Sequence, residues 1–485
     1  MAILSILEPT RCTADGEPRS DRTGPPVVPP VVGADLRVPL AGGGTIGYAS
    51  LDHAASAPAL VAVRDAVDQA LASYASVHRG SGWASQVTTA WYEQARDEVA
   101  RFVGARPQDE VVFTRQTTDA LCLLAHSLPT DTHVFVFDSE HHANLLTWPA
   151  DRTTRLGIPR SGRALLRTLG EALRSAPNGP RLVCVAGASN VTGELLPVAE
   201  VAALAHAHGA RVCLDAAQLA PHRPVDISSS DIDYVAVSGH KLYAPFGAGA
   251  LVGRADWLDA APAYLPGGGA ATSVTADAVS WATGADRHEG GSPNVVGAVA
   301  LAAACATLRR HQDAVALHEV RLSTRLRQRL SQIDGVRLLA TFSPSRDRVG
   351  TVAFTVAGYP SDLVATYCSA EYGIGVRAGK FCAHQLTDSL LAEPDPFGAG
   401  NRHDPAGHNP GDDSEGHVRA GELDGHDRAA AVRASIGLAS TTEHVDRLVD
   451  AIRTLVQGGP RLEYRRTVDG WVVEGDRRRL PSRPW

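Results

Sequence analysis

Short apolar runs alternate with helix-forming segments between residues 110 and 254, and this pattern constrains the fold more than any other feature of the chain. The predicted buried strands are 110–115, 133–138, 181–189, 211–217, 234–239 and 249–254. The runs are apolar throughout rather than at every second position, which is typical of a parallel sheet covered by helices on both faces. The sequence therefore predicts an α/β fold with a mostly parallel sheet.

The chain of 485 residues is too long for one compact core, so we expect two folded domains with additional segments. A flexible Pro-rich arm is predicted over 1–38 and a large domain over 39–300. The pattern then changes to longer helices with fewer strands, which predicts a smaller α+β domain over 301–458. Inside it, 388–428 is poor in apolar residues and is predicted to be a disordered insertion. A C-terminal tail with one strand pair is predicted over 459–485.

Composition argues against several classes of partner. The net charge of −7 gives no basis for binding nucleic acid or an acidic membrane surface. No apolar stretch reaches the 18 residues of a membrane-spanning helix, and the N-terminus lacks the pattern of a signal peptide. The seven cysteines are odd in number and scattered, which favours free thiols in a reducing compartment. We therefore expect a soluble cytoplasmic protein.

Only two lysines, Lys241 and Lys380, occur in the chain. Lys241 directly follows the predicted strand 234–239, and Asp215 lies at the end of the predicted strand 211–217. Open α/β sheets bind ligands at the carboxyl ends of their strands. A lysine and an aspartate at two such ends are the pair that pyridoxal 5'-phosphate needs, because the amine bonds to its aldehyde and the carboxylate keeps its ring nitrogen protonated. The alternative is an Asp that caps a turn and a Lys in a surface ion pair.

Two further pairs of residues favour the cofactor. Thr117 and Thr118 begin a helix directly after the strand 110–115, where helix-end N–H groups and hydroxyls bind phosphate. Helix capping accounts for one threonine but does not require both. The adjacent histidines at 141 and 142 follow another strand, where an imidazole can stack on an aromatic ring and move protons. As a metal site this pair lacks a nearby third ligand.

These residues belong to a longer series of motifs that resembles a known family. In chain order the motifs are LDHAASAP, VHRG, RQTTDA, EHHANLLTW, SNVTGELLP, DAAQ, SGHKLYAPFGAG, PGGG, HEGGSPN, VRAGKFCA and VRASIGL. The series resembles cysteine desulfurases and selenocysteine lyases, most closely the SufS-like branch, over roughly 48–387 and 430–457. These are class V members of the fold-type I pyridoxal phosphate enzymes. The resemblance implies that fold, a homodimer, and removal of sulfur from L-cysteine to leave L-alanine, with transfer to a sulfur-acceptor protein.

The resemblance also implies roles for individual residues. Lys241 is implied to be the Schiff-base lysine and proton carrier, Asp215 the partner of the ring nitrogen, and His142 the side chain stacked on the ring. The other implied cofactor contacts are Gln218 with the ring hydroxyl, Thr118, Ser238 and His240 with the phosphate, and Gly267 and Ser292 with the phosphate from a partner subunit. The implied substrate contacts are Asn190 and Arg433 with the carboxylate, and Arg377, His78 and Arg79 at the entrance.

Cys382 decides the type of reaction. The resemblance implies that its thiolate attacks the substrate sulfur and becomes a persulfide, and Arg377 and Lys380 lie within five residues to favour the thiolate. The chain departs from the family pattern at Gln116, where a Gly is usual, and at Lys380-Phe381, where two histidines are common. Two alternatives remain open. One is a related lyase, aminotransferase or epimerase that does not use Cys382, and the other is a non-catalytic scaffold that keeps the fold.

Overall fold

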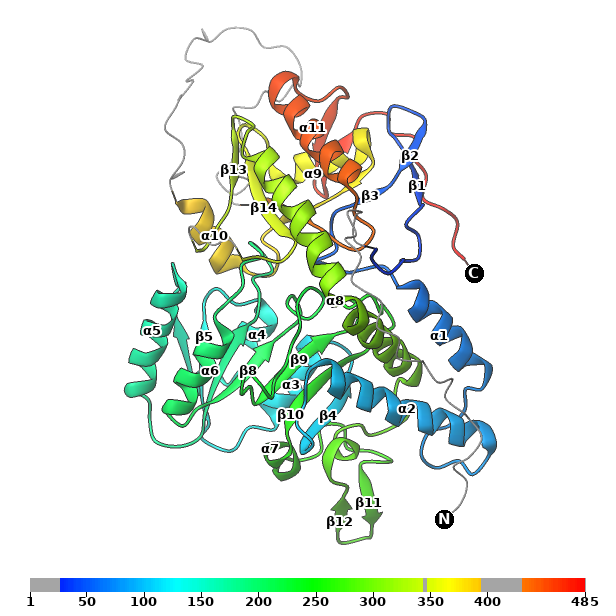
Figure 1. Ribbon diagram of the computed structural model, residues 1–485, viewed down its shortest axis with the longest axis vertical. Coiled ribbons are helices and arrows are strands. Elements are labelled where there is room, and N and C mark those ends of the chain that lie inside the picture. Colours follow the sequence, from blue (N-terminus) through cyan, green and yellow to red (C-terminus); the bar gives the residue numbers. More distant parts are fainter. Residues whose placement is uncertain (1–26, 343–346, 394–429, 485) are drawn as a thin grey trace, which may run out of the picture.

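The computed structural model describes residues 27–342, 347–393 and 430–484, and it confirms the α/β architecture (Figure 1). A seven-stranded sheet has the order β4-β10-β9-β8-β7-β5-β6. The strands, in that order, are Asp109–Thr114, Gly249–Arg254, Tyr234–Ser238, Arg211–Asp215, Arg181–Ala186, His133–Phe137 and Thr153–Leu156. Only β10 runs antiparallel to its neighbours, β4 and β9, and the other neighbouring strands pair in parallel.

Helices cover both faces of this sheet, which explains why its strands are apolar throughout. On β9, Val235 and Val237 pack into one core, whereas Tyr234 and Ala236 pack into the core on the other face. The helices of this unit are α1 (Val61–Ala72), α2 (Trp83–Phe102), α3 (Thr117–His126), α4 (His142–Leu146), α5 (Gly162–Arg174), α6 (Val198–Ala207) and α7 (Ala255–Ala260). A hairpin of β11 (Ala271–Val274) and β12 (Val279–Trp281) projects from it (Figure 1).

A second, smaller unit is built on an antiparallel sheet of order β13-β14-β17-β16. Its strands in that order are Val336–Leu338, Thr351–Val356, Ala431–Ser435 and Arg377–Gly379. Its helices are α9 (Ser361–Tyr372), α10 (His384–Ala392) and α11 (Thr442–Gly458). The tail forms the hairpin β18 (Tyr464–Thr467) and β19 (Gly470–Val473), which contacts α9.

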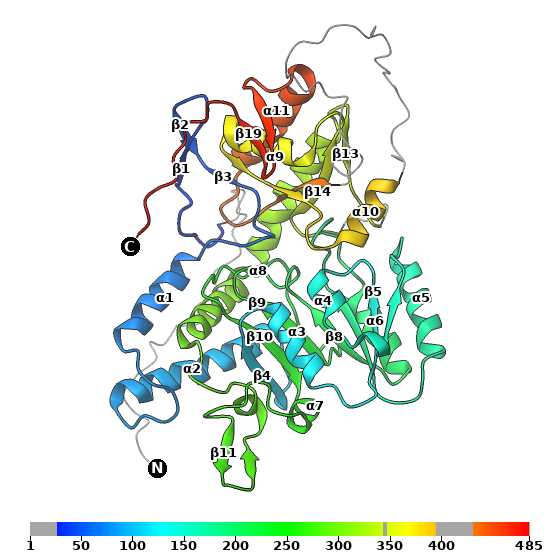
Figure 2. The same ribbon diagram turned by 180° about the vertical axis from the view of Figure 1, so that it is seen from behind.

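The two units share α8, a helix of 36 residues over Val295–Leu330 (Figures 1 and 2). Its first half, with Leu301 and Leu308, packs into the core of the large unit. Its second half, with Leu322, Leu326 and Leu330, packs into the core of the small unit. The domain boundary expected at residue 300 therefore falls inside a continuous helix.

The predicted terminal arm and insertion lie largely outside the described residues. At the end of the arm, β1 (Arg37–Pro39) pairs with β2 (Thr45–Gly47), and β3 (Ala49–Ser50) then pairs in parallel with β15 (Ile374–Gly375) of the small unit. The start of the predicted insertion, 388–392, instead belongs to α10, because Leu386 and Leu390 of that helix are buried together. No helix in the described part of the chain is long and apolar enough to cross a membrane.

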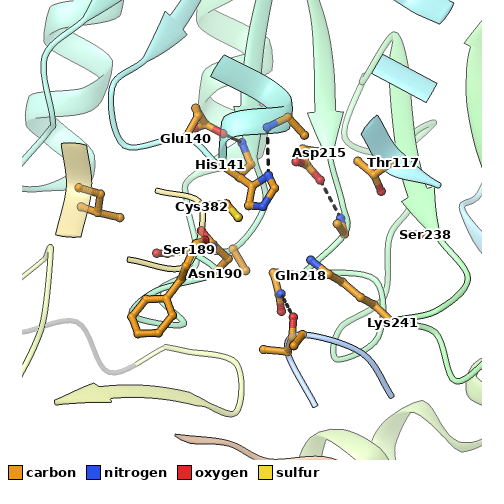
Figure 3. A pocket seen from close by; sticks show the side chains of 18 of the residues that line it. Thr117, Glu140, His141, Ser189, Asn190, Asp215, Gln218, Ser238, Lys241 and Cys382 are labelled. Atoms are coloured by element: carbon orange, nitrogen blue, oxygen red, sulfur yellow. Dashed lines mark hydrogen bonds between the residues drawn. The ribbon is translucent and has the colours of Figure 1, made fainter. Parts of the chain in front are cut away.

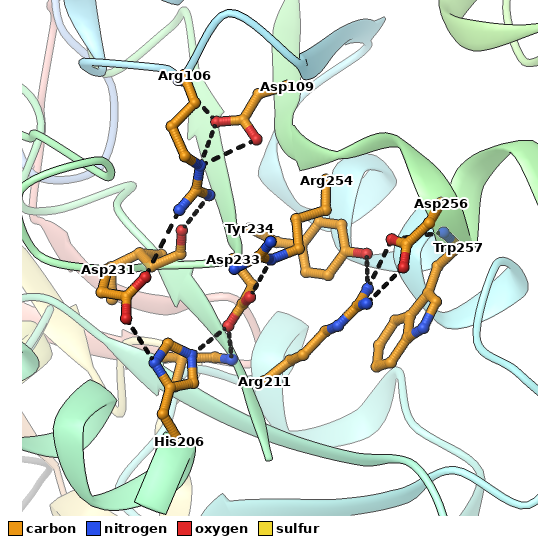
Figure 4. A network of polar contacts seen from close by, with 12 residues as sticks. Arg106, Asp109, His206, Arg211, Asp231, Asp233, Tyr234, Arg254, Asp256 and Trp257 are labelled. Atoms are coloured by element: carbon orange, nitrogen blue, oxygen red, sulfur yellow. Dashed lines mark hydrogen bonds and ion pairs between the residues drawn. The ribbon is translucent and has the colours of Figure 1, made fainter. Parts of the chain in front are cut away.

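Ion pairs join the strands at the amino-terminal edge of the parallel sheet (Figure 4). Asp233, just before β9, is buried, accepts hydrogen bonds from the Val212 backbone N–H and from His206, each at 2.8 Å, and pairs with Arg254. Arg211, at the start of β8, pairs with Asp256. These contacts hold three strands in register at this edge, and the opposite edge is where the main cavity lies.

Candidate active site

A cavity of about 440 Å³ lies at the carboxyl ends of the parallel strands, between the two units (Figure 3). Asp215 and Ser238 line it as the last residues of β8 and β9. Lys241 follows in the turn after β9, and its side chain extends into the space below Asp215 in Figure 3. The small unit contributes Cys382 and Arg433 to the same cavity. The structure thus brings together residues separated by more than 150 positions.

In this cavity the charges of Lys241 and Asp215 affect each other's pKa. Desolvation lowers the pKa of Lys241 to about 8; Asp215 opposes the shift, and Arg433 adds to it. Burial raises the pKa of Asp215, while a hydrogen bond of 2.9 Å from the Ala217 backbone N–H and the charge of Lys241 act in the opposite direction. A lysine with a pKa near 8 is neutral in about one tenth of the molecules at pH 7, far more than an ordinary lysine, so it can act as a nucleophile and as a base.

Two buried hydroxyls in the cavity wall suit a phosphate group. Thr117 Oγ1, at the start of α3, and Ser238 Oγ have no hydrogen-bond partner among the described residues. Thr118 and His240 line the same cavity. Gln116, where the family usually has Gly, is the N-cap of α3, and its side chain accepts a hydrogen bond from the Asp119 N–H at 3.1 Å. An anion at this helix start would satisfy hydroxyls that are otherwise unpaired, so these residues fit the phosphate of the cofactor.

The structure places His141, not His142, in the cavity (Figure 3). His141 precedes α4, and its Nδ1 accepts a hydrogen bond from the Ala143 N–H at 3.1 Å. Burial lowers the pKa of His141 to about 4, and Lys241 contributes to that shift. His142 is the first residue of α4 and packs its ring against His384 at 4.5 Å between centroids. The expectation that His142 faces the cofactor is therefore wrong, because the turn before α4 directs only the first histidine inward.

Arg433 is held in place by contacts from both units. Its side chain is only 3% exposed, Nη1 donates to the Asn190 carbonyl at 2.8 Å, and Nη2 lies 3.3 Å from Asp52 Oδ1. The guanidinium also lies over the Phe381 ring, 5.0 Å from its centroid. Arg377 lines the same cavity and contacts the same Asp52 at 3.0 Å. Sequence reasoning did not single out Asp52, although it stands in the LDHAASAP motif.

Cys382 is exposed and lies in a tightly held loop. Phe381 and Cys382 both have φ of 53°, the left-handed region that non-glycine residues seldom adopt. The His142 backbone N–H donates to the Cys382 carbonyl at 2.7 Å, and Asn190 Nδ2 donates to the Phe381 carbonyl at 2.6 Å. Such backbone strain persists only where the surroundings impose it, and it is frequent at functional sites. The Cys382 thiol is close enough to Lys241 and Arg433 to affect the pKa of each.

The other predicted site residues are divided between this cavity and a second one. Gln218 and Asn190 line the main cavity, and Gln218 Nε2 donates to the Ala54 carbonyl at 2.7 Å. His78, Arg79 and Ser292 instead line a separate cavity of about 360 Å³, and Gly267 directly precedes the glycines of its wall. None of these four lines the cavity of Lys241 in the described part of the chain. No group of three or more metal-ligating side chains occurs among the described residues.

Glu140 is a second residue that sequence reasoning missed, and unlike Asp52 it lines the cavity (Figure 3). It is 1% exposed and accepts hydrogen bonds from Asn144 Nδ2 at 2.8 Å and from the Ala186 backbone N–H at 2.9 Å. These bonds tie α4 to the end of β7, directly behind His141. Burial raises the pKa of Glu140 to about 8. The sequence around Glu140, the motif EHH, does not indicate this role, because the role depends on a contact with Ala186, which lies 46 residues further along the chain.

Comparison with known proteins identifies the family. Residues 49–448 match the family described as aminotransferase class-V. The chain is 32% identical to a probable cysteine desulfurase of Vibrio cholerae, covering 84% of this chain and 93% of that relative. It is 36% identical to a cysteine desulfurase of Dickeya dadantii, covering 70% and 84%. The crystal structure of the cysteine desulfurase CsdA of Escherichia coli matches with a TM-score of 0.66 and 30% identity, covering 84% and 94%.

The family depends on pyridoxal phosphate, and the cavity residues fit that cofactor. The amine of Lys241, the carboxyl of Asp215 and the two unpaired hydroxyls correspond to its aldehyde, ring nitrogen and phosphate. The chain therefore belongs to the aminotransferase class-V family of pyridoxal phosphate enzymes and, within it, to the cysteine desulfurases.

Proposed function

We propose that this protein converts L-cysteine to L-alanine and carries the released sulfur as a persulfide on Cys382. The observation that carries the proposal is that Cys382 lines the same cavity as Lys241 and Asp215. A related lyase or aminotransferase needs the lysine and the aspartate but has no use for an exposed thiol in a strained loop beside them.

Pyridoxal phosphate, when bound, supplies an electron sink next to the substrate Cα. Lys241 would hold it covalently, and Asp215 would bind its ring nitrogen. Thr117 and Ser238 would donate to its phosphate, and His141 would lie against its ring. These assignments are supported by the shared cavity and by the hydroxyls that are unpaired among the described residues.

The side chains of this chain then divide the chemistry. Arg433 binds the substrate carboxylate, and its Nε, which has no partner among the described residues, is available for that bond. Lys241, with a pKa of about 8, takes the proton from the substrate Cα and returns it. The Cys382 thiolate attacks the substrate sulfur, so that an S–S bond forms and the C–S bond breaks. The electron pair of the C–S bond stays on the carbon skeleton, which is protonated to give alanine, and the persulfide remains on Cys382.

The sulfur must then leave, and the exposure of Cys382 suits transfer to a sulfur-acceptor protein. We also propose a homodimer in which His78, Arg79, Gly267 and Ser292 complete the cavity of the partner subunit. Their separation from the Lys241 cavity within one chain supports that arrangement. Sedimentation at the mass of a single chain would contradict it. A cytoplasmic location is part of the same proposal, supported by the cysteine pattern.

The decisive experiment is incubation of the reconstituted enzyme with L-cysteine, followed by assay of alanine and sulfide. We expect Cys382→Ala to lose desulfuration while it keeps the absorbance of the bound cofactor. Cys122→Ala is the matched control, because Cys122 lies on α3 outside the cavity lining, and it should retain activity. Alanine formation by Cys382→Ala at the wild-type rate would reject the persulfide mechanism. No alanine from the wild type would favour the lyase, aminotransferase or epimerase alternative, with selenocysteine tested separately, and no cofactor absorbance would favour the scaffold.

A further inference from the structure

Two arginines of the cavity wall stand directly opposite each other in the small sheet. Arg377 on β16 and Arg433 on β17 are paired residues of the antiparallel ladder, and both line the cavity. Like charges at directly opposite positions destabilise a sheet. A third group must therefore compensate this pair.

Asp52 provides that compensation with a single carboxylate. Its Oδ2 lies 3.0 Å from Arg377 Nε, and its Oδ1 lies 3.3 Å from Arg433 Nη2. Asp52 follows β3 and does not itself line the cavity, so it acts on a ligand only through the two arginines. Its side chain is 24% exposed, against 49% for Arg377 and 3% for Arg433.

The charges at this wall add up to one positive unit, because two guanidiniums face one carboxylate. Burial lowers the pKa of Arg433, Asp52 opposes that shift, and Arg377 adds to it. A substrate with one carboxylate would bring the wall to neutrality. A second carboxylate on the substrate would have to compete with Asp52 for Arg377.

We propose that Asp52 is a positioning and specificity-determining residue, which neutralises one arginine so that the cavity selects ligands with a single carboxylate. The inference rests on the proposed function in one respect, namely that the arginine wall receives the carboxylate of an amino acid. The selectivity for one carboxylate is then set by a side chain that the substrate does not touch.

The test measures carboxylate binding to the cofactor-loaded protein by calorimetry, with propanoate and butanedioate as probes that differ by one carboxylate. The measured quantity is the ratio of the two dissociation constants. We expect Asp52→Asn to shift this ratio by about tenfold toward butanedioate, since one uncompensated charge is added at a partly exposed site. Asp52→Glu keeps the charge and should restore the wild-type preference.

Arg377 offers a matched series of wall charges. Arg377→Gln leaves Arg433 and Asp52, with no net charge, and should weaken both ligands and shift the ratio toward propanoate. The double variant Asp52→Asn/Arg377→Gln returns the wall to one positive charge and should return the ratio to within about threefold of the wild type. A change of less than about twofold in Asp52→Asn would overturn the proposal. If that variant does not fold, a double variant with the ratio of Arg377→Gln would overturn it equally.

Binding is measured without turnover, so the two proposals fail separately. If no alanine is formed but the ratio of dissociation constants changes as expected in the Asp52 and Arg377 variants, only the desulfurase reaction is rejected. Normal desulfuration, together with a ratio of dissociation constants that does not change with the charge of the arginine wall, would reject the role of Asp52 alone.

Discussion

Replacing Ser238 by alanine should have opposite effects on two properties: the ligand-free protein should keep or gain stability, whereas the affinity for pyridoxal phosphate should fall. Ser238 is 2% exposed, and its Oγ has no partner among the described residues. A buried polar group left unpaired costs about 1–3 kcal/mol, so Ser238→Ala should leave the ligand-free protein equally stable or more stable by up to about 1 kcal/mol. A hydrogen bond to a charged phosphate contributes about 1.5–3 kcal/mol. Its loss should raise the dissociation constant of pyridoxal phosphate by roughly 10- to 100-fold.

The assay pairs two measurements on the same variant. Thermal unfolding of the ligand-free protein gives the change in stability, and an absorbance titration with pyridoxal phosphate gives the affinity. Thr351→Val is the matched control, because Thr351 is 1% exposed on β14, its Oγ1 also lacks a partner among the described residues, and it does not line the cavity. The control should change stability in the same direction and leave the affinity unaltered. A Ser238→Ala protein that is destabilised by more than about 1 kcal/mol, with normal affinity, would refute the phosphate assignment.

Three further predictions separate the roles of charged residues. Burial raises the pKa of Glu140 to about 8, whereas the pKa of a glutamate in the unfolded chain is about 4.3. Between these two pH values the folded protein binds one proton more than the unfolded chain, so the free energy of unfolding falls as the pH rises. Glu140→Gln should remove this decline, seen as urea midpoints at pH 5 and pH 8, and an unchanged slope would contradict the reasoning. Asp233→Asn weakens the ion pair between this buried carboxylate and Arg254, whose side chain is 38% exposed, and should destabilise the protein by about 1–2 kcal/mol without changing cofactor affinity, which a titration checks. Lys241→Ala should lose the absorbance of the covalently bound cofactor, whereas Lys380→Met should keep it. The reason is that Lys380 lies outside the cavity lining and pairs with Asp388 at 2.7 Å. Loss of this absorbance in Lys380→Met would contradict the assignment of Lys241 as the lysine that binds the cofactor.

Strands with an apolar run could be predicted from the sequence, and the edge strand β6 could not. The strands β5 and β9 are apolar at nearly every position because both of their faces meet a core. The strand β6 has the sequence TTRL and lies at the edge of the sheet with one buried residue, Leu156, so it carries no apolar run. The pairing that makes it a strand comes from β5 and not from its own side chains.

The site divides in the same way between local and tertiary causes. Lys241 and Asp215 could be predicted because each lies at or just beyond the end of a recognisable strand, and parallel strands end at one edge. The choice between His141 and His142 depends on the backbone conformation of one turn, which two identical neighbouring side chains do not reveal. Asp52 gains its role only where three segments distant in sequence meet. The residues that neighbour Asp52 in the sequence do not indicate its contacts with Arg377 and Arg433.

The continuous helix α8 has a consequence for how the molecule loses its structure. One helix of 36 residues inserts leucines into both cores, and β3 adds a second link between the N-terminal segment and the small unit. Melting either core would remove the packing that stabilises the corresponding half of this helix, and isolated helices gain little stability from propensity alone. The described parts of the two units should therefore unfold as one cooperative body, with a single calorimetric transition. Their active site, which lies between them, would be lost in that same transition.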